Sequence, residues 1–237
     1  MKDQTYLYIT CTGIALLFLG KLIPQWAVFL ATVSLCYGTV VLGMILLVRT
    51  GLVSFGHGLY YCLGAYAAGT LKPFWGSSDV IVMLAAAVFL TATVSFILGF
   101  LLRKYRDIFF AMLSLAFSMI LYGLLSKSAI LGSTDGFNVS IDTVFGVSLS
   151  ETGYARYIIF VITVIFSWIS CILMHRYLKS DKGKLAEAIR DNELRVEYLG
   201  ANVAHIIHLN YVISAVLAGI GGALMAISIG HIDPEMS

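Results

Sequence analysis

Seven apolar runs, separated by short charged clusters, divide the 237-residue chain from end to end. Each run has about the 20 residues that an α-helix needs to cross the ~30 Å hydrocarbon core of a bilayer. Backbone groups in lipid must be hydrogen-bonded internally, which favours helices over loops. We place the spans at Tyr6–Leu22, Trp26–Val48, Leu52–Leu71, Val80–Leu102, Ile108–Leu125, Tyr157–His175 and Ile206–Ile229. This pattern predicts an all-α polytopic membrane protein with one transmembrane domain over residues 1–237.

The composition excludes a water-soluble enzyme of this size. Hydrophobic residues make up 59% of the chain and charged residues only 12%, with a net charge of +2. Soluble domains carry about 25% charged residues, and a charge of +2 is too small to indicate nucleic-acid binding. The first run follows Lys2, as in a signal peptide, but no small-residue cleavage site follows it cleanly. We therefore expect an uncleaved first helix.

The distribution of Lys and Arg predicts the orientation. If the N-terminus is cytoplasmic, eleven of the 15 basic residues lie inside, and only Lys21, Lys72, Lys127 and Arg156 lie outside. This matches the positive-inside bias of membrane proteins. The long loop 126–156 is then extracytoplasmic, and the most charged stretch, 179–205, is cytoplasmic.

The predicted spans contain no Asp or Glu. Intramembrane acids usually mark proton or ion pathways, so their absence argues against a proton-coupled carrier and against a membrane hydrolase. The five histidines and four cysteines show no metal-ligand spacing within a span, and no phosphate-binding glycine loop is present. We predict no catalytic residues, no metal site and no cofactor in this chain.

A glycine-rich segment begins the third span and predicts a broken helix, because each glycine costs about 1 kcal/mol in a helix relative to Ala. Irregular backbone at membrane depth is tolerated where it is buried or lines a wet cavity. Close helix packing explains the same small residues, and both interpretations stay open. The candidate pathway residues are Ser54, Phe55, Gly56, His57, Gly58, Gly64 and Tyr66.

The cytoplasmic stretch predicts a short amphipathic helix over Leu185–Leu199 that ends at Gly200. Its apolar stripe is Leu185, Ala188, Ile189, Val196 and Leu199, interrupted by Asn192. We expect Glu187–Arg190 and Asp191–Arg195 pairs on the polar side. A lipid-surface helix would be rich in Lys and Arg, whereas acids including Glu193 outnumber bases here. The sequence therefore favours a protein partner for this helix.

Two rows of small residues run along the last span. Such rows let another helix approach closely and predict packing within the membrane. They are Ala215, Gly219 and Ala223 in one row, and Ala218, Gly222 and Ala226 in the other.

At these motifs the chain resembles the permease subunits of bacterial ABC importers for branched-chain amino acids, a group whose wider relatives handle urea and simple sugars. The most specific stretch runs from Ala188-Ile-Arg-Asp-Asn-Glu193 through Gly200 to Ser214-Ala-x-x-Ala-Gly-x-x-Gly-Ala-Leu224. Weaker similarities lie in Ser54–Gly58 and in Phe109–Phe117. Gly132–Gly136 is similar to the family's Thr-Gly-Gly-x-x-Gly stretch, with Ser-Thr-Asp in its middle.

The resemblance implies a multi-pass subunit of the bacterial inner membrane that pairs with a second, similar permease. It also implies two cytoplasmic ATPase subunits, which bind ATP and Mg, and an extracytoplasmic solute-binding protein. The Leu185–Leu199 helix would be the element that an ATPase grips, with Ala188, Arg190 and Asp191 among its contacts. Family members normally continue past the position of Pro234 with further helices, so the resemblance leaves open whether this chain is a complete or a truncated permease.

Two other functions remain as alternatives at this point. An ion-coupled carrier or channel for a small neutral solute would work without an ATPase, and a urea or sugar ABC permease would share the same architecture. The sequence does not identify the solute, because spans without ionised residues would bind it through backbone, hydroxyl groups and helix ends.

Overall fold

The computed structural model describes residues 4–76, 79–128, 131–141, 143–144, 147–148 and 155–236. Long helices dominate this part of the chain. They are α1 (Gln4–Leu22), α2 (Gln25–Arg49), α3 (His57–Trp75), α4 (Val80–Leu102), α5 (Asp107–Lys127), α6 (Ala155–Lys179), α7 (Asp181–Asp191), α8 (Glu193–Tyr198) and α9 (Val203–Ile229).

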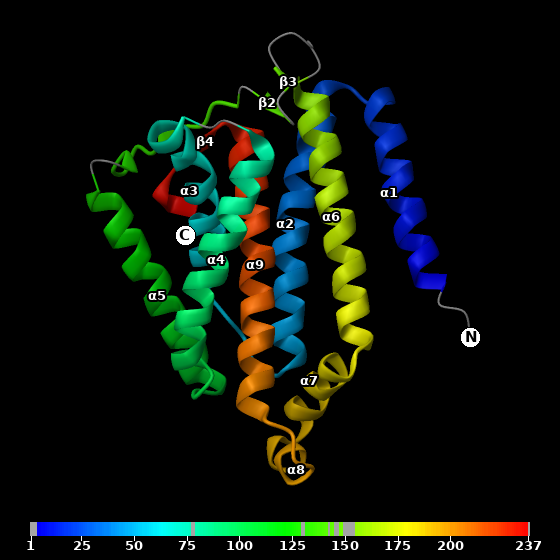
Figure 1. Ribbon diagram of the computed structural model, residues 1–237, viewed down its shortest axis with the longest axis vertical. Coiled ribbons are helices and arrows are strands. Elements are labelled where there is room, and N and C mark those ends of the chain that lie inside the picture. The colour runs from blue at the N-terminus through cyan, green and yellow to red at the C-terminus, as the bar shows by residue number, and fades with distance from the viewer. Residues whose placement is uncertain are drawn as a thin grey trace.

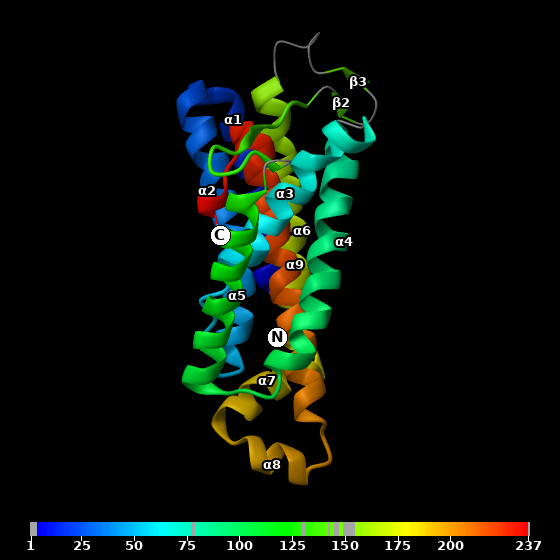
Figure 2. The ribbon, with the colours of Figure 1, turned by 90° about the vertical axis from the view of Figure 1, so that its left-hand side faces the viewer.

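The long helices run along a common axis around α9, as Figure 1 shows. Helix α9 makes its most extensive contacts with α2, α3 and α4, whereas α1 packs mainly on α6. The short helices α7 and α8 lie together at one end of the bundle, and α8 is farthest from it (Figures 1 and 2). Helix α5 stands at the edge of the bundle, opposite α1.

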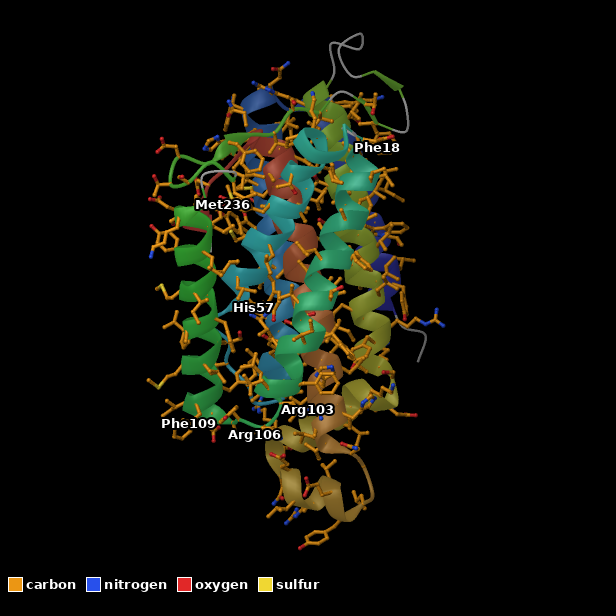
Figure 3. The ribbon with its side chains drawn as sticks, turned by 60° about the vertical axis from the view of Figure 1, so that its left-hand side comes forward. Phe18, His57, Arg103, Arg106, Phe109 and Met236 are labelled. Carbon is orange, nitrogen blue, oxygen red and sulfur yellow. The ribbon has the colours of Figure 1, made fainter. Side chains whose placement is uncertain are left out.

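The outer surface of the bundle is apolar. Phe18, Phe89, Ile108 and Phe109 are exposed large side chains, and Figure 3 places Phe18 and Phe109 at the periphery. Continuous apolar exposure of this kind is unfavourable in water and suits lipid. The chain is thus a multi-pass helical membrane protein.

Small residues bring α9 against its neighbours. A Cβ atom on Gly64 would lie 2.1 Å from the carbonyl oxygen of Gly219, and one on Gly222 would lie 1.9 Å from that of Tyr61. A Cβ on Gly219 would also meet Thr91 of α4 at 2.4 Å. Ala215, Ala218 and Ala223, the other residues expected in helix packing, are fully buried. The small rows of α9 therefore face helices of the same chain.

Six of the described helices are long and apolar enough to cross a membrane, namely α1, α2, α4, α5, α6 and α9. The seventh long helix, α3, contains His57, Lys72 and Pro73 and is largely buried among its neighbours. Its polar and small residues are therefore shielded by protein. This explains why hydropathy alone identifies this span less clearly than the other six.

Irregular backbone lies at the glycine-rich segment as predicted, at residues 51–56, but it precedes the helix rather than breaking it, because α3 begins at His57 and runs to Trp75. The break lies before the helix. Gly51 has a φ of +79°, and its N–H bonds to the carbonyl of Val48 while the N–H of Leu52 bonds to that of Leu47. This pair of bonds is a Schellman motif, which ends α2 at a glycine.

The described residues contain two small antiparallel sheets, each made of two short strands. β1 (Phe137–Asn138) pairs antiparallel with β4 (His231–Ile232), and β2 (Thr143–Val144) pairs with β3 (Val147–Ser148). The β1–β4 pair joins the loop after α5 to the chain that leaves α9. A short 3₁₀ helix, η3 (Pro234–Met236), follows β4. Because each strand has only two residues, the fold still belongs to the all-α class.

Candidate functional site

The non-helical segment between α2 and α3 is held against α5. The Ser114 hydroxyl oxygen accepts a hydrogen bond from the N–H of Phe55 at 3.2 Å. A Cβ on Gly56 would lie 2.5 Å from the carbonyl oxygen of Ser114, so only glycine fits without a shift. Ser54 accepts a bond from the N–H of Gly56 at 3.3 Å. Residues 54–56 are therefore ordered by contacts with one neighbouring helix.

His57, the first residue of α3, joins three helices. Its Nε2 lies 2.6 Å from the hydroxyl of Ser214 in α9, which donates to the carbonyl of Gly43 in α2 at 2.6 Å. The Ser214 hydroxyl has one proton and donates it to the Gly43 carbonyl, so toward His57 it can only accept. Nε2 of His57 therefore carries the imidazole proton, and Nδ1 is a hydrogen-bond acceptor. His57 is only 5% exposed, and its Nδ1 has no partner among the described residues.

A cavity of about 520 Å³ adjoins this segment. Four of the sequence-predicted pathway residues line it together, namely Ser54, Phe55, His57 and Gly58. Figure 3 places His57 near mid-height of the bundle, with Met236, another lining residue, nearer the end opposite α8. The remaining predicted pathway residues lie elsewhere. Gly56 and Gly64 are at helix contacts, and Tyr66 is buried against Phe137, with ring centroids 5.7 Å apart.

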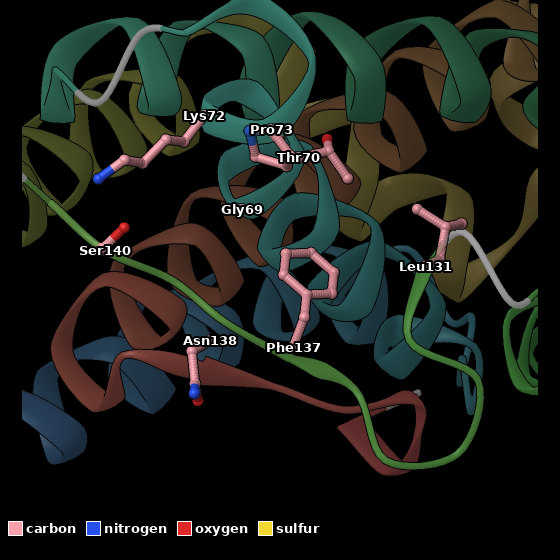
Figure 4. Close-up of a pocket in the computed structure, with 8 residues that line it drawn as sticks. All are labelled: Gly69, Thr70, Lys72, Pro73, Leu131, Phe137, Asn138 and Ser140. Atoms are coloured by element: carbon pink, nitrogen blue, oxygen red, sulfur yellow. The ribbon is translucent and has the colours of Figure 1, made fainter.

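A second, smaller pocket of about 350 Å³ opens at the end of α3 farthest from α8. Figure 4 shows the chain around Phe137, Asn138 and Ser140 crossing beside α3, with Thr70 and Lys72 on the helix. The pocket is thus bordered by hydroxyl, amide and ammonium groups. It lies beyond the predicted pathway residues, at the opposite end of the bundle from α7 and α8.

The predicted cytoplasmic helix Leu185–Leu199 is two helices. Asn192 has φ −162° and ψ 99°, which interrupts the helix, and its side chain accepts from the N–H of Arg195 at 3.1 Å to begin α8. Asn is a preferred N-cap residue for this reason. A single helix over the whole stretch is therefore a wrong prediction. Gly200, with a φ of +84°, follows the end of α8 as expected.

Two ion pairs connect the α7–α8 segment (residues 181–198) to the bundle. Glu187 of α7 bonds to Arg49 at the end of α2 at 2.8 Å. Glu193 of α8 forms a bidentate pair with Arg106, with distances of 2.9 Å to Nε and 2.6 Å to Nη2. These hydrogen bonds lower the pKa of the Glu193 carboxyl. The two halves of the segment are thus tied to different helices.

The structure corrects the predicted faces of this segment. Gly183, Ala186, Ile189 and Val196 are buried, and Leu185 is half-buried, whereas Ala188 and Leu199 are exposed. The break at Asn192 rotates α8 relative to a continuous helix, which removes Leu199 from the stripe.

The ion pairs also differ from those predicted. Glu187 pairs with Arg49 rather than with Arg190. Arg190 is exposed, with its stem over Gly51, and Asp191 is exposed as well.

Sequence reasoning missed several residues of the cavity. Tyr61 lies four residues after His57, so helical spacing places the two on one face of α3 and could have identified it. Tyr37 of α2 and Asp233 and Glu235 near η3 also line the cavity. No local pattern links these residues to His57, because the fold brings them together from distant parts of the chain.

The described residues contain no group of three His, Cys, Asp or Glu side chains that could hold a metal ion.

Comparisons with known proteins agree with this description. The family model described as "Branched-chain amino acid transport system / permease component" matches residues 26–237. The branched-chain amino acid permease protein LivM of Escherichia coli is 27% identical over 90% of this chain and 55% of its own length. The permease protein BraD of Pseudomonas aeruginosa is 27% identical over 86% of this chain and 70% of its own length.

The chain therefore spans about half the length of the LivM proteins that it matches. No solved structure gives a significant match. Because the family model matches nearly all of the sequence, from the start of α2 onward, the chain belongs to the family of branched-chain amino acid transport system permease components.

Proposed function

We propose that the chain is the membrane subunit of an ATP-driven importer of branched-chain amino acids in a bacterial inner membrane. It works with a second permease, two cytoplasmic ATPase subunits that bind ATP and Mg, and an extracytoplasmic binding protein. The observation that carries the proposal is the α7–α8 segment, which is fastened to the bundle by two ion pairs and exposes an apolar surface.

The exposed surface of α8 is suited to a protein partner. Leu194, Tyr198 and Leu199 are 64%, 89% and 84% exposed. Tyrosine and large aliphatic side chains at such a site are typical of interfaces. The segment lies beyond the ends of the long helices (Figure 1), which favours a cytoplasmic protein over the lipid surface. The excess of basic residues at this end supports a cytoplasmic position for the segment and for the N-terminus.

Movement of α8 would reach the pathway through α5. The Arg106–Glu193 pair joins α8 to the residue before α5. Further along α5, Ser114 holds the backbone of Phe55 and Gly56. A displacement of α8 by an ATPase would therefore shift the segment that borders the cavity.

Movement of α7 would reach a different helix. The Arg49–Glu187 pair joins α7 to the end of α2, which forms another wall of the cavity. Nucleotide drives this cycle only if it binds one orientation of the assembly better than the other.

The experiment is leucine uptake into proteoliposomes that contain the complete assembly. Radiolabelled leucine is supplied with the binding protein, and ATP is enclosed on the ATPase side. We expect uptake that requires both ATP and the ATPase subunits. A matched preparation with a catalytically inactive ATPase is the control.

Leucine uptake by this chain without any ATPase would overturn the proposal and favour an ion-coupled carrier or channel. ATP-driven uptake of urea or a sugar, without leucine uptake, would overturn the assignment of the solute. Separate uptake measurements with labelled leucine and with labelled urea or sugar distinguish these two results.

A further inference from the structure

The 520 Å³ cavity collects groups that attract a cation. The half-buried Asp233 and the exposed Glu235 line it, as does the buried His57. Because the His57 Nε2 proton is directed to Ser214, its buried and unpartnered Nδ1 is a hydrogen-bond acceptor. His57 Nδ1 is thus a buried acceptor without a donor among the described residues.

Two tyrosines add an aromatic wall. Tyr37 and Tyr61 both line the cavity, and their rings are stacked with centroids 5.8 Å apart and planes inclined by 13°. The faces of aromatic rings attract ammonium groups. Tyr61 lies one helical turn from His57, so the imidazole and the aromatic wall are neighbours on α3.

The rest of the lining is aliphatic and adaptable. It includes three methionines, whose flexible thioether side chains fit irregular apolar groups. The aliphatic residues are Val40, Met44, Met225, Ile229 and Met236. The cavity therefore combines an acceptor-rich part with an apolar part of the kind that an aliphatic side chain requires.

We propose that this cavity is a solute site that binds the ammonium group of an aliphatic amino acid. The carboxylates of Asp233 and Glu235 and the rings of Tyr37 and Tyr61 receive the ammonium group, and the methionine-rich wall receives the side chain. The proposal rests on the proposed transport function and extends it, because urea and sugars lack the cationic group that these residues select. It assigns a binding role to the chain after α9.

The first test is chemical protection in the assembled transporter. A cysteine is introduced as Phe55→Cys, at an exposed lining residue to which the proposal gives no contact with the ammonium group, and its modification by a methanethiosulfonate is followed by mass spectrometry at that position. Leucine and isoamylamine, which both carry an ammonium group, should slow the modification about tenfold when each is present at about ten times its dissociation constant. The probe 4-methylpentanoate, which has the side chain but no ammonium group, should not. Equal rates with all three probes, in both nucleotide-free and ATP-bound assemblies, would overturn the proposal.

The second test uses uptake with two matched variants. The double variant Asp233→Asn/Glu235→Gln should lose about 90% of ATP-driven leucine uptake while keeping ATPase activity stimulated by the binding protein. Asp135→Asn, which neutralises an exposed acid outside the cavity, should keep both.

The uptake results also separate this proposal from the proposed function. If the unsubstituted assembly transports no leucine, the proposed function fails. If it transports leucine and the double variant does so equally well, only the cavity assignment fails.

Discussion

At the scale of single residues, the tightest constraints are glycines where two backbones touch. Gly222 and Gly64 hold α3 and α9 together because a side chain would meet a carbonyl oxygen. Gly38 of α2, by contrast, has nothing within 4 Å of its Cβ position. The sequence marks all of these residues as small, but only the packed structure tells which of them need to be.

Gly222→Ala should lower the free energy of unfolding by about 1–3 kcal/mol, the usual cost of overpacking. The added methyl group would overlap the carbonyl oxygen of Tyr61, and this oxygen cannot easily move because it belongs to the backbone of α3. Gly38→Ala is the matched control and should stabilise by up to about 1 kcal/mol through helix propensity. Thermal unfolding in detergent measures both, and equal behaviour of the two variants would contradict the packing described for α9.

Glu193 gives the α7–α8 segment a pH dependence with a definite sign. Hydrogen bonds from Arg106 lower the pKa of this carboxyl in the folded protein. Its contribution to stability is therefore complete above the pKa of the unfolded chain and is lost as pH falls through the lowered folded value. Unfolding temperatures from pH 8 to pH 3 should show wild type losing its advantage over Glu193→Gln in acid. A difference that stays constant over this range would show that the ion pair contributes nothing.

At the scale of elements, the α7–α8 segment shows where sequence reasoning works and where it fails. Polar–apolar periodicity correctly indicates helix around Ile189 and Val196, and both are buried. The sequence alone does not reveal that Asn192 begins a new helix, because an Asn within a periodic pattern is also compatible with one bent helix. The partners Arg49 and Arg106 come from other helices, and no local spacing points to them.

The Arg106–Glu193 pair should transmit movement from α8 to α5. Arg106→Glu and Glu193→Arg each place like charges together, and each should lower ATP-driven leucine uptake about fivefold or more while ATPase activity persists. The exchanged double variant restores opposite charges and should recover most of the uptake. Its failure to recover, with the protein folded and in the membrane, would remove this pair from the coupling route.

At the scale of the whole molecule, hydropathy predicts the membrane class and six spans well, since their apolar residues face outward or fill the bundle. It is least accurate for α3, whose polar residues are sheltered by α4, α5 and α9. The cavity is beyond local prediction altogether. Tyr37, His57 and Asp233 come from three distant parts of the chain, and only tertiary packing puts them around one space.

The central claim is that a cytoplasmic ATPase holds the exposed side of α8. A photo-cross-linking amino acid in place of Leu199, which is 84% exposed, tests it most directly in the assembled importer. The same probe in place of Phe89, on the outer surface of α4, is the control and should label lipid. The account predicts a cross-link from position 199 to the ATPase subunit whose yield changes when ATP binds. Labelling of lipid alone from position 199 would contradict it.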